Sequence, residues 1–441
     1  MEEGLPRLKG WQWFKVCGQE CPHHEQEEGK MIEFELPEGI KGIKKMINGL
    51  ASGIMRKWAR WADENEHKKV DEWINLMWNA TKGMGGALFG GGKEKKAEGA
   101  PEGEKKISLR NIQLAVVAEE LGWGDAGLYL TIPSPGLGGA AVAAAGTPEQ
   151  REKFLKRFTE GKPKWGAMAI TEPGCGSDSA AITTTAVRDG NEWVINGEKI
   201  FVTAGKSAVE DSEGFVVVWA TVDKKAGRAG IKSFIVDHHT PGMKVTKVEH
   251  KLGIRASDTA AIVFEDCRIP FENILGDPEV KKGFRDVMAT FDATRPMVAA
   301  NALGIARAAV EEVQKHFKEA GLEIRYGVAP NNLSARERDL MMMEAQVKAS
   351  RLLTWRAAWM ADAGIHNNME ASMCKAKTGK AITWVTQKAV ELMGPLGYSR
   401  KLLLEKWMRD GKINDIFEGT GQINTLIVAR RILNYTREQL K

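Results

Sequence analysis

Apolar residues in the first third of the chain recur at helical spacing. Over about 42–78 they return every three or four positions and give one amphipathic face. The same spacing returns over 109–121 and 148–158. Between them, the small residues of 138–146 either allow close helix packing, which we expect, or leave room for a ligand. We therefore predict a helical N-terminal domain over 31–165.

The periodicity changes after Trp165. Short runs of β-branched and aromatic residues follow, at 193–197, 215–220, 233–236 and 260–264. The turn Asp189-Gly190-Asn191 before the first run predicts a β-hairpin. We therefore predict an all-β central domain over 166–275.

Long helical patterns resume in the last third of the chain. They cover 287–319, 334–363, 369–393 and 422–435. Gly321 and Gly364 are placed to end two of these helices. Long helices with short connections predict a four-helix bundle over 276–441. The fold class predicted is α+β and multidomain, with helical domains before and after a β domain.

Two segments lack any periodic pattern. Residues 1–30 predict an appended, mobile N-terminal extension, and 82–106, rich in glycine, lysine and glutamate, predicts a loop or disordered insertion.

Composition excludes several classes of protein. With 63 basic and 58 acidic residues, the net charge of +5 is too small and dispersed to indicate a nucleic-acid partner. No apolar run approaches the roughly 18 residues of a membrane span, and the N-terminus lacks a signal or transit pattern, which favours the cytoplasm. Five cysteines do not form a disulfide framework. Cys17, Cys21, His23 and His24 fit no common zinc spacing, so no metal site is predicted.

Two segments more than two hundred residues apart carry the candidate chemistry. Residues 171–178 form a polar turn whose hydroxyls and backbone N–H groups can hold a cofactor. Residues 415–422 place Glu418 between Phe417 and Gly419, with Thr420 positioned as the N-cap of the last helix. A buried carboxylate facing a redox cofactor can remove a proton from a weakly acidic carbon.

Together, the segments Thr171-Glu172-Pro173-Gly174-Cys175-Gly176-Ser177-Asp178 and Asp415-Ile416-Phe417-Glu418-Gly419-Thr420-Gly421-Gln422 resemble the signature regions of the acyl-CoA dehydrogenases. These FAD enzymes introduce an α,β double bond into acyl-CoA thioesters. The resemblance implies the fold of that family, in which a helical domain, a β-barrel-like central domain and a four-helix bundle follow one another. It also implies that Glu418 removes the α-proton while flavin N5 accepts the β-hydride, giving the trans-2-enoyl-CoA. Some relatives carry the base at the position of about Ala293 or Thr294, and neither residue is acidic here.

The resemblance implies a set of flavin contacts. The cofactor-binding residues would be Met168, Ile170, Thr171, Ser177, Phe201, Thr203, Gly394, Thr420 and Gln422. Thr171 would hydrogen-bond the isoalloxazine ring, and Phe201 would cover the ring face opposite the substrate. The alternative for Phe201 is an ordinary core position on a strand.

A second set of residues would meet the acyl-CoA. The implied contacts are Ser177, Asp292, Thr294, Arg295 and Gly419. The Glu418 backbone N–H and a flavin ribityl hydroxyl would polarise the thioester oxygen. The alternative for Arg295 is a salt bridge on a helix face.

The chain departs from the family pattern in three places. The segment 323–330 replaces an Arg-x-x-Phe-Gly motif that reaches the flavin of a neighbouring subunit, so we leave open whether Arg325 makes that contact. Glu391 stands where a glutamine commonly contacts the AMP half of the flavin. The extension 1–30 and the insertion 82–106 have no usual counterpart.

As partners, the resemblance implies an acyl-CoA substrate, an electron-transfer flavoprotein and a homotetramer or homodimer, with a role in fatty acid β-oxidation. Two alternatives stay open. Oxygen-using acyl-CoA oxidases and flavin monooxygenases share the fold, although the monooxygenases generally lack the equivalent of Glu418. A non-catalytic relative acting as a binding partner is the second. The sequence does not predict the acyl chain length.

Overall fold

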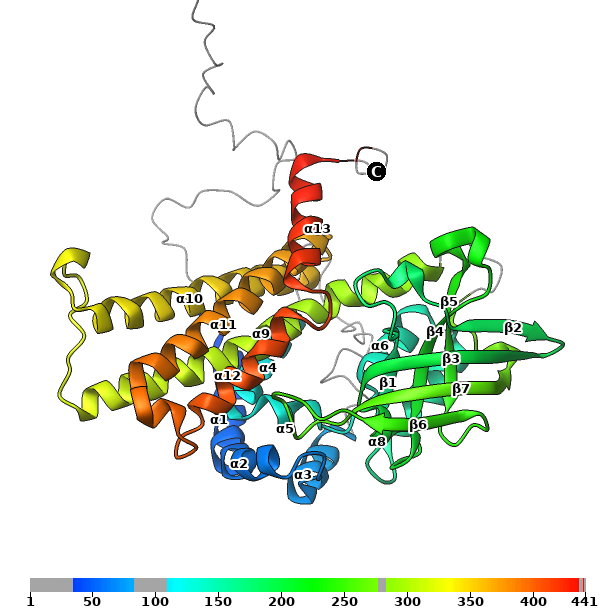
Figure 1. Cartoon of the computed structure of the whole chain (residues 1–441), viewed down its shortest axis with the longest axis horizontal. Helices are drawn as coiled ribbons and strands as arrows, with labels where there is room; N and C mark the ends of the chain where they lie inside the picture. The colour runs from blue at the N-terminus through cyan, green and yellow to red at the C-terminus, as the bar shows by residue number, and fades with distance from the viewer. Residues whose placement is uncertain (1–34, 83–108, 277–282, 436–438, 440–441) are drawn as a thin grey trace, which may run out of the picture. The chain divides into compact units, whose positions relative to one another are not determined.

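The computed structural model describes residues 35–82, 109–276, 283–435 and 439, with the backbone alone over 283–292. Along the chain, helices precede and follow a central sheet, as the sequence pattern predicted (Figure 1). The extension 1–30, and all of the insertion 82–106 except its first residue, lie outside the described residues. By their internal contacts, Met1–Glu38 and Gly39–Lys441 form two units, and the elements that build the site belong to the second.

Helices form most of the described chain before the sheet. They are α1 (Glu38–Leu50), the π-helical turn η1 (Ala51–Met55), α2 (Arg56–Glu64), α3 (Asp71–Thr81), α4 (Arg110–Gly124), α5 (Ala126–Leu130), α6 (Gly136–Ala145), α7 (Pro148–Leu155) and the 3-10 helix η4 (Lys156–Thr159). The predicted helix over 42–78 is divided between α2 and α3, where His67 has a left-handed φ of 67°. The apolar spacing continues across this break because both helices bury side chains, Ala62 and Trp73 among them, in one core.

The run of small residues serves close packing, as we expected. A Cβ on Gly138 of α6 would lie 2.3 Å from the carbonyl oxygen of Ala167, and one on Gly136 would lie 2.4 Å from that of Gly166. Helix α6 therefore contacts strand β1 (Gly166–Ala169) through backbone atoms, and only glycine permits that distance.

The central strands form one mixed sheet. Besides β1 they are β2 (Thr185–Asp189), β3 (Glu192–Thr203), β4 (Phe215–Thr221), β5 (Ile231–Asp237), β6 (Met243–Val248) and β7 (Thr259–Pro270), with the short helix α8 (Gly205–Val209) after β3. The order is β1-β4-β2-β3-β7-β6, and β5 pairs with β4. The predicted hairpin is confirmed, because Asp189 pairs with Glu192 across Gly190 and Asn191. Strand β6 was not predicted from the sequence.

Strand β4 is buried on both faces. Phe215, Val217 and Trp219 pack in a core with residues of α6 and α7, while Val216 and Val218 pack in the core that α2 and α3 share. A strand covered on both sides reads as a continuous apolar run, which explains why 215–220 shows no alternation.

The helices after the sheet form the predicted bundle. They are α9 (Gly283–Glu319), α10 (Ala335–Asp362), α11 (Asn368–Tyr398), α12 (Leu404–Lys412), the 3-10 turn η9 (Ile413–Asp415) and α13 (Gly421–Leu433). Gly321 and Gly364 follow the ends of α9 and α10 with φ of 72° and 69°, as predicted. Ser334 and Glu337 form a capping box at the start of α10. Within the described ranges, no helix is both long and apolar enough to cross a membrane.

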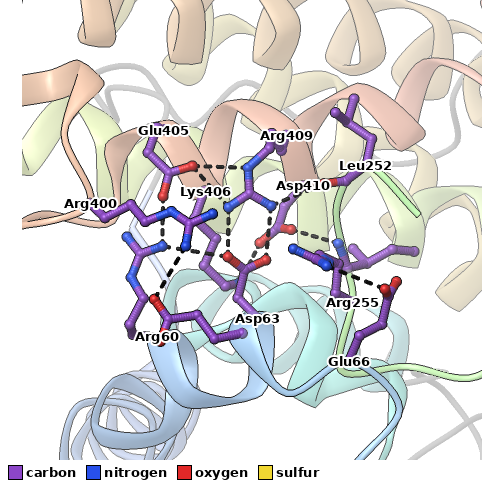
Figure 2. A network of polar contacts seen from close by, with 12 residues as sticks. Arg60, Asp63, Glu66, Leu252, Arg255, Arg400, Glu405, Lys406, Arg409 and Asp410 are labelled. Carbon is purple, nitrogen blue, oxygen red and sulfur yellow. Dashed lines mark hydrogen bonds and ion pairs between the residues drawn. The ribbon is translucent and has the colours of Figure 1, made fainter. Parts of the chain in front are cut away.

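Buried ion pairs join α12 to the N-terminal helices, and hydrogen bonds join it to the β6–β7 loop (Figure 2). The Lys406 Nζ lies 2.5 Å from carboxylate oxygens of both Asp125 and Asp410, and each of the three residues is 1% exposed. Asp410 also accepts a 2.6 Å hydrogen bond from the Ile254 backbone N–H. Next to them, Arg409 pairs with Asp63 of α2 at 2.6 Å. These contacts fix α12, which leads directly into the segment that carries Glu418.

Replacement of Lys406 by methionine should strongly destabilise the fold. The variant leaves two buried carboxylates without their shared cation, and breaking such a pair costs about 3–5 kcal/mol. Urea unfolding followed by circular dichroism measures the loss, with Lys401→Met, an exposed lysine nearby, as the control. Equal free energies of unfolding in the two variants would contradict this role of Lys406.

Candidate active site

Glu418 lies on a tight turn between η9 and α13. Glu418 and Gly419 both have left-handed backbones, with φ of 53° and 92°. The Thr420 Oγ1 accepts a 3.3 Å hydrogen bond from the Ile423 N–H, which confirms Thr420 as the N-cap of α13. A non-glycine residue at positive φ is strained, and such strain persists only where the surroundings enforce it.

The carboxylate of Glu418 has one hydroxyl partner. The Thr294 Oγ1 of α9 donates a 2.7 Å hydrogen bond to the Glu418 Oε2. Burial raises the pKa of Glu418, against the Thr294 hydrogen bond and the positive charges of Lys375 and Arg295, which favour the ionised form. A carboxylate with a raised pKa is a stronger base than an ordinary glutamate.

Arg295 supports the turn from α9. Its side chain is 5% exposed, and its Nε lies 3.5 Å from the Glu418 carbonyl oxygen. Its Nη1 lies 3.3 Å from the Ser372 Oγ of α11. Arg295 therefore bridges α9 and α11 beneath the turn. The next residue, Pro296, cannot donate a backbone hydrogen bond within α9.

Tyr129 was not singled out from the sequence, yet it lies close enough to Glu418 for their charges to interact. Burial raises the pKa of the Tyr129 phenol to about 12, and the charge of Glu418 adds to the shift. Tyr129 belongs to the short helix α5 and packs against the core beneath the sheet. A lone tyrosine in a short apolar helix carries no signal in the sequence that would distinguish it from a core residue.

The polar turn 171–178 is held by a buried carboxylate. Glu172 accepts hydrogen bonds from the backbone N–H groups and the hydroxyls of Thr183 and Thr184, and from the Lys199 Nζ at 2.7 Å. Burial opposes ionisation of Glu172, but the hydrogen bonds from Lys199, Thr184 and Thr183 lower its pKa to about 2. The glutamate of the motif is thus structural, and it leaves Ser177 exposed beside it.

Strand β3 has an irregularity beside this turn. The pairing register with β7 shifts between Lys199 and Val202, and Phe201 there has a φ of 56° and is 58% exposed. The Ile200 N–H donates a 2.9 Å hydrogen bond to the Thr171 carbonyl, which joins the irregularity to the polar turn. The exposure of the Phe201 ring excludes the core position that was the alternative, and strained backbones of this kind cluster at ligand and active sites.

The structure gathers the predicted residues into two groups. One contains Glu418, Thr294, Arg295, Gly419 and Thr420, and the other surrounds the polar turn, with Met168, Ile170, Thr171, Ser177, Phe201 and Thr203. Gly394 lies at a break in α11, where its φ is 55° and its ψ is −135°. No contact described for Gly394 or Gln422 joins them to either group. The Asp292 side chain lies outside the described residues.

Two residues at which the chain departs from the family pattern, Arg325 and Glu391, each form an ion pair with a nearby side chain. The Arg325 guanidinium binds both carboxylate oxygens of Glu337 at 2.8 Å. Its neighbour Tyr326 lines a groove of about 360 Å³ between α9 and α10. Glu391 forms an ion pair with Lys388 at 2.8 Å on the exposed face of α11.

A possible set of metal ligands, Glu66, His67 and His250, occurs among the described residues. Glu66 already accepts hydrogen bonds from His250 and from the Lys251 backbone N–H, and its Oε2 lies 3.3 Å from the Arg255 guanidinium. We therefore assign no metal to this set. The four N-terminal residues for which no metal site was predicted lie outside the described residues: Cys17, Cys21, His23 and His24.

Three family models together match most of the chain. The N-terminal domain model of the acyl-CoA dehydrogenases matches residues 44–162, the middle domain model 167–267 and the C-terminal domain model 281–433.

Individual relatives align over nearly the whole chain. Acryloyl-CoA reductase (NADH) of Anaerotignum propionicum is 32% identical, over 92% of this chain and 98% of the relative. Short-chain specific acyl-CoA dehydrogenase of Clostridium acetobutylicum is 34% identical, over 91% and 100%. These named enzymes identify the chain as an oxidoreductase and not as a non-catalytic binding partner.

Solved structures agree with this assignment. Butyryl-CoA dehydrogenase from Megasphaera elsdenii superposes with a TM-score of 0.77 at 30% identity, covering 91% of this chain and 100% of that one. A chain in a structure of the electron transferring flavoprotein of Acidaminococcus fermentans gives 0.77 at 32%, covering 92% and 100%. The cofactor implied is FAD, and the exposed ring of Phe201 beside a polar turn fits a flavin.

Replacement of Phe201 by alanine should weaken retention of FAD more than it affects the fold. The variant removes an aromatic side chain that is mostly exposed, so little packing inside the protein is lost. The flavin released during gel filtration measures retention, and the melting temperature of the apoprotein measures the fold. Val187→Ala, at a 62% exposed position on β2, is the control. Equal flavin retention in the Phe201 variant and the parent would contradict this placement.

Proposed function

The chain belongs to the acyl-CoA dehydrogenase family and is an FAD-dependent oxidoreductase, and we propose that Glu418 is the base that removes the α-proton of a short-chain acyl-CoA. The observation that carries the proposal is the 2.7 Å hydrogen bond from Thr294 to the Glu418 carboxylate. It lies on a strained, half-buried turn, where loss of hydration raises the pKa of Glu418. The names of the Clostridium and Megasphaera relatives support a short acyl chain.

The side chains around Glu418 divide the work of proton removal. Thr294 aims the carboxylate through its hydroxyl, and Arg295 lies against the Glu418 carbonyl oxygen. The Glu418 C=O and the Gly419 N–H belong to one peptide bond and point in opposite directions, so the Gly419 N–H points away from Arg295. The Glu418 N–H is the proposed donor to the thioester oxygen, and it would stabilise the enolate as charge develops there. FAD, when bound, supplies the acceptor for the electrons of the β-carbon.

We propose an electron transferring flavoprotein as the electron acceptor. The likeness to a chain in the structure of that flavoprotein from Acidaminococcus fermentans supports it. Asp292 and Ser177 remain proposed contacts of the CoA arm, and the homotetramer remains a proposal from the family.

A second candidate is the reverse reaction, reduction of an enoyl-CoA. The similarity to acryloyl-CoA reductase (NADH) over almost the whole chain favours it. Protonated Glu418 would then return a proton to the α-carbon, so the same site serves both directions.

The visible spectrum of the purified protein tests these proposals. Anaerobic addition of saturated acyl-CoAs of different lengths should bleach the flavin band, most rapidly with a short chain. A band that only NADH bleaches, and that an enoyl-CoA then restores, would favour the reductase. A band indifferent to every acyl-CoA would contradict the proposed dehydrogenation.

Substitution of Glu418 by glutamine should greatly slow turnover and keep FAD. Loss of the base is expected to slow acyl-CoA oxidation by about two to four orders of magnitude, since the amide cannot accept the proton. Stopped-flow bleaching of the flavin measures the rate. Glu323→Gln, the same change at an exposed position after α9, is the control. Turnover near the parental rate would exclude Glu418 as the base.

The pH dependence of the bleaching rate should show a base with a raised pKa. Glu418 accepts a proton only when ionised, so the rate rises as pH increases through its pKa. Because that pKa is raised, the acid limb is expected above the ordinary 4.5. Thr294→Val removes a hydrogen bond that favours the ionised form, so it should move the limb to still higher pH. A limb at or below 4.5, or one that Thr294→Val leaves in place, would contradict the assignment.

A further inference from the structure

A buried lysine that the proposed reaction does not use lies beneath the turn. Lys375 of α11 is 1% exposed, and its Nζ donates hydrogen bonds to the carbonyl oxygens of Asn414, at 2.6 Å, and Gly419, at 3.2 Å. It also lies 5.8 Å from the centroid of the Phe417 ring. The Lys375 ammonium group therefore lies against three parts of this segment. They are the Asn414 carbonyl before the turn, the Phe417 ring, and the Gly419 carbonyl at the end of the turn.

The environment of Lys375 differs from that of the other buried lysine described above. Lys406 pairs with two carboxylates, whereas no ion pair of Lys375 occurs in the part of the chain that the structure describes. Burial lowers the pKa of Lys375 to about 8, in spite of the negative charges of Glu418 and Asp415. A buried cation held mainly by carbonyls is costly to keep, and a methionine of similar volume would pack there at less cost. The lysine thus requires a reason other than packing.

The reason lies in the geometry of the turn. Glu418 and Gly419 both have positive φ. The Glu418 carbonyl oxygen faces a side-chain donor on α9, and the Gly419 carbonyl oxygen faces donors on α11 and α13. The Gly419 carbonyl accepts from the Lys375 Nζ and also, at 2.7 Å, from the Asn424 Nδ2. Carbonyl oxygens carry partial negative charge, so a cation beneath them stabilises this strained arrangement over relaxed ones.

The charge of Lys375 also acts on the Glu418 carboxylate. Among the described residues, Lys375 and Arg295 are the cations that favour the ionised form. Within the same part of the chain, the titratable and charged groups that act on Glu418 and Lys375 are Tyr129 of α5, Arg295 of α9, Cys374 of α11 and Asp415 of η9.

We propose that Lys375 is a positioning residue for Glu418: it holds the left-handed turn by its carbonyls and keeps the carboxylate ionised between turnovers. The inference rests on the proposed role of Glu418 as the base. It adds to that role a residue 43 positions earlier in the chain, on a different helix, that makes no contact with the proton to be removed.

Lys375→Met tests the proposal, with Lys377→Met as the matched control. Lys377 lies two residues further along α11, and its Nζ instead hydrogen-bonds the Gln346 side chain of α10. Both variants lose one positive charge from the same helix. The bleaching rate with saturating acyl-CoA is measured from about pH 5 to 10, together with KM, FAD content and melting temperature.

Lys375→Met should lower the limiting rate at pH 7 by about tenfold or more, with a smaller change in KM, because the base is misplaced and less ionised. The acid limb of its pH–rate profile should move to higher pH by about one unit, because the loss of one modest charge interaction with Glu418 raises a pKa by about that much. The parent enzyme should lose rate above about pH 8, where Lys375 loses its proton, and the variant should lack this decline. Lys375→Arg, whose charge does not titrate, should restore the acid limb and also abolish the decline.

A purely structural role gives a different result. Lys375→Met would then lose stability or FAD, while the rate per bound flavin and the pH profile would stay parental, and the proposal would be overturned. A pH profile shifted equally by Lys377→Met would overturn it as well. If the parent protein fails to bleach, or if Glu418→Gln bleaches normally, the proposed function fails and not merely the role of Lys375.

Discussion

A base for carbon acids must be kept from water and still have partners that tolerate its charge. Burial raises the pKa of Glu418, the proposed base, and among the described residues the Thr294 hydroxyl and the cations Lys375 and Arg295 oppose this shift. Too much compensation would make the carboxylate an ordinary weak base, and too little would leave it protonated. The position of the turn between α9 and α11 determines this balance, so the chemistry depends on how these helices pack.

The packing that fixes the turn begins far from it in the sequence. Helix α12 ends just before η9 and Glu418, and its Lys406, Arg409 and Asp410 are bound by α2, α5 and the loop before β7. Figure 2 shows how these charged groups converge from segments far apart in the chain. A segment tied on several sides cannot relax the strained backbone that follows it, and this restraint is what a positive φ at Glu418 requires.

The side of the site that we propose for the flavin uses a similar arrangement. Glu172 is the buried charge, its partners are Thr183, Thr184 and Lys199, and the strained residue beside it is Phe201. In both halves, hydrogen bonds within the protein hold a buried ionic group, Lys375 or Glu172. The strained residue next to it, Glu418 or Phe201, carries the proposed function. Stability and function are thus assigned to different residues of the same short motif.

The order of helices and sheet, the β2–β3 hairpin, the bundle and the N-cap at Thr420 could all be predicted from the sequence, because they follow from local periodicity, turn residues and capping chemistry. The two motifs also pointed to Glu418 and the polar turn. The proposed role of Lys375 and the electrostatic link between Tyr129 and Glu418 could not be predicted in this way. A lysine on one helix and a tyrosine on another acquire their meaning only when the chain brings them to the same carboxylate, and burial, which sets their pKa values, is a property of the folded chain and not of any window of sequence.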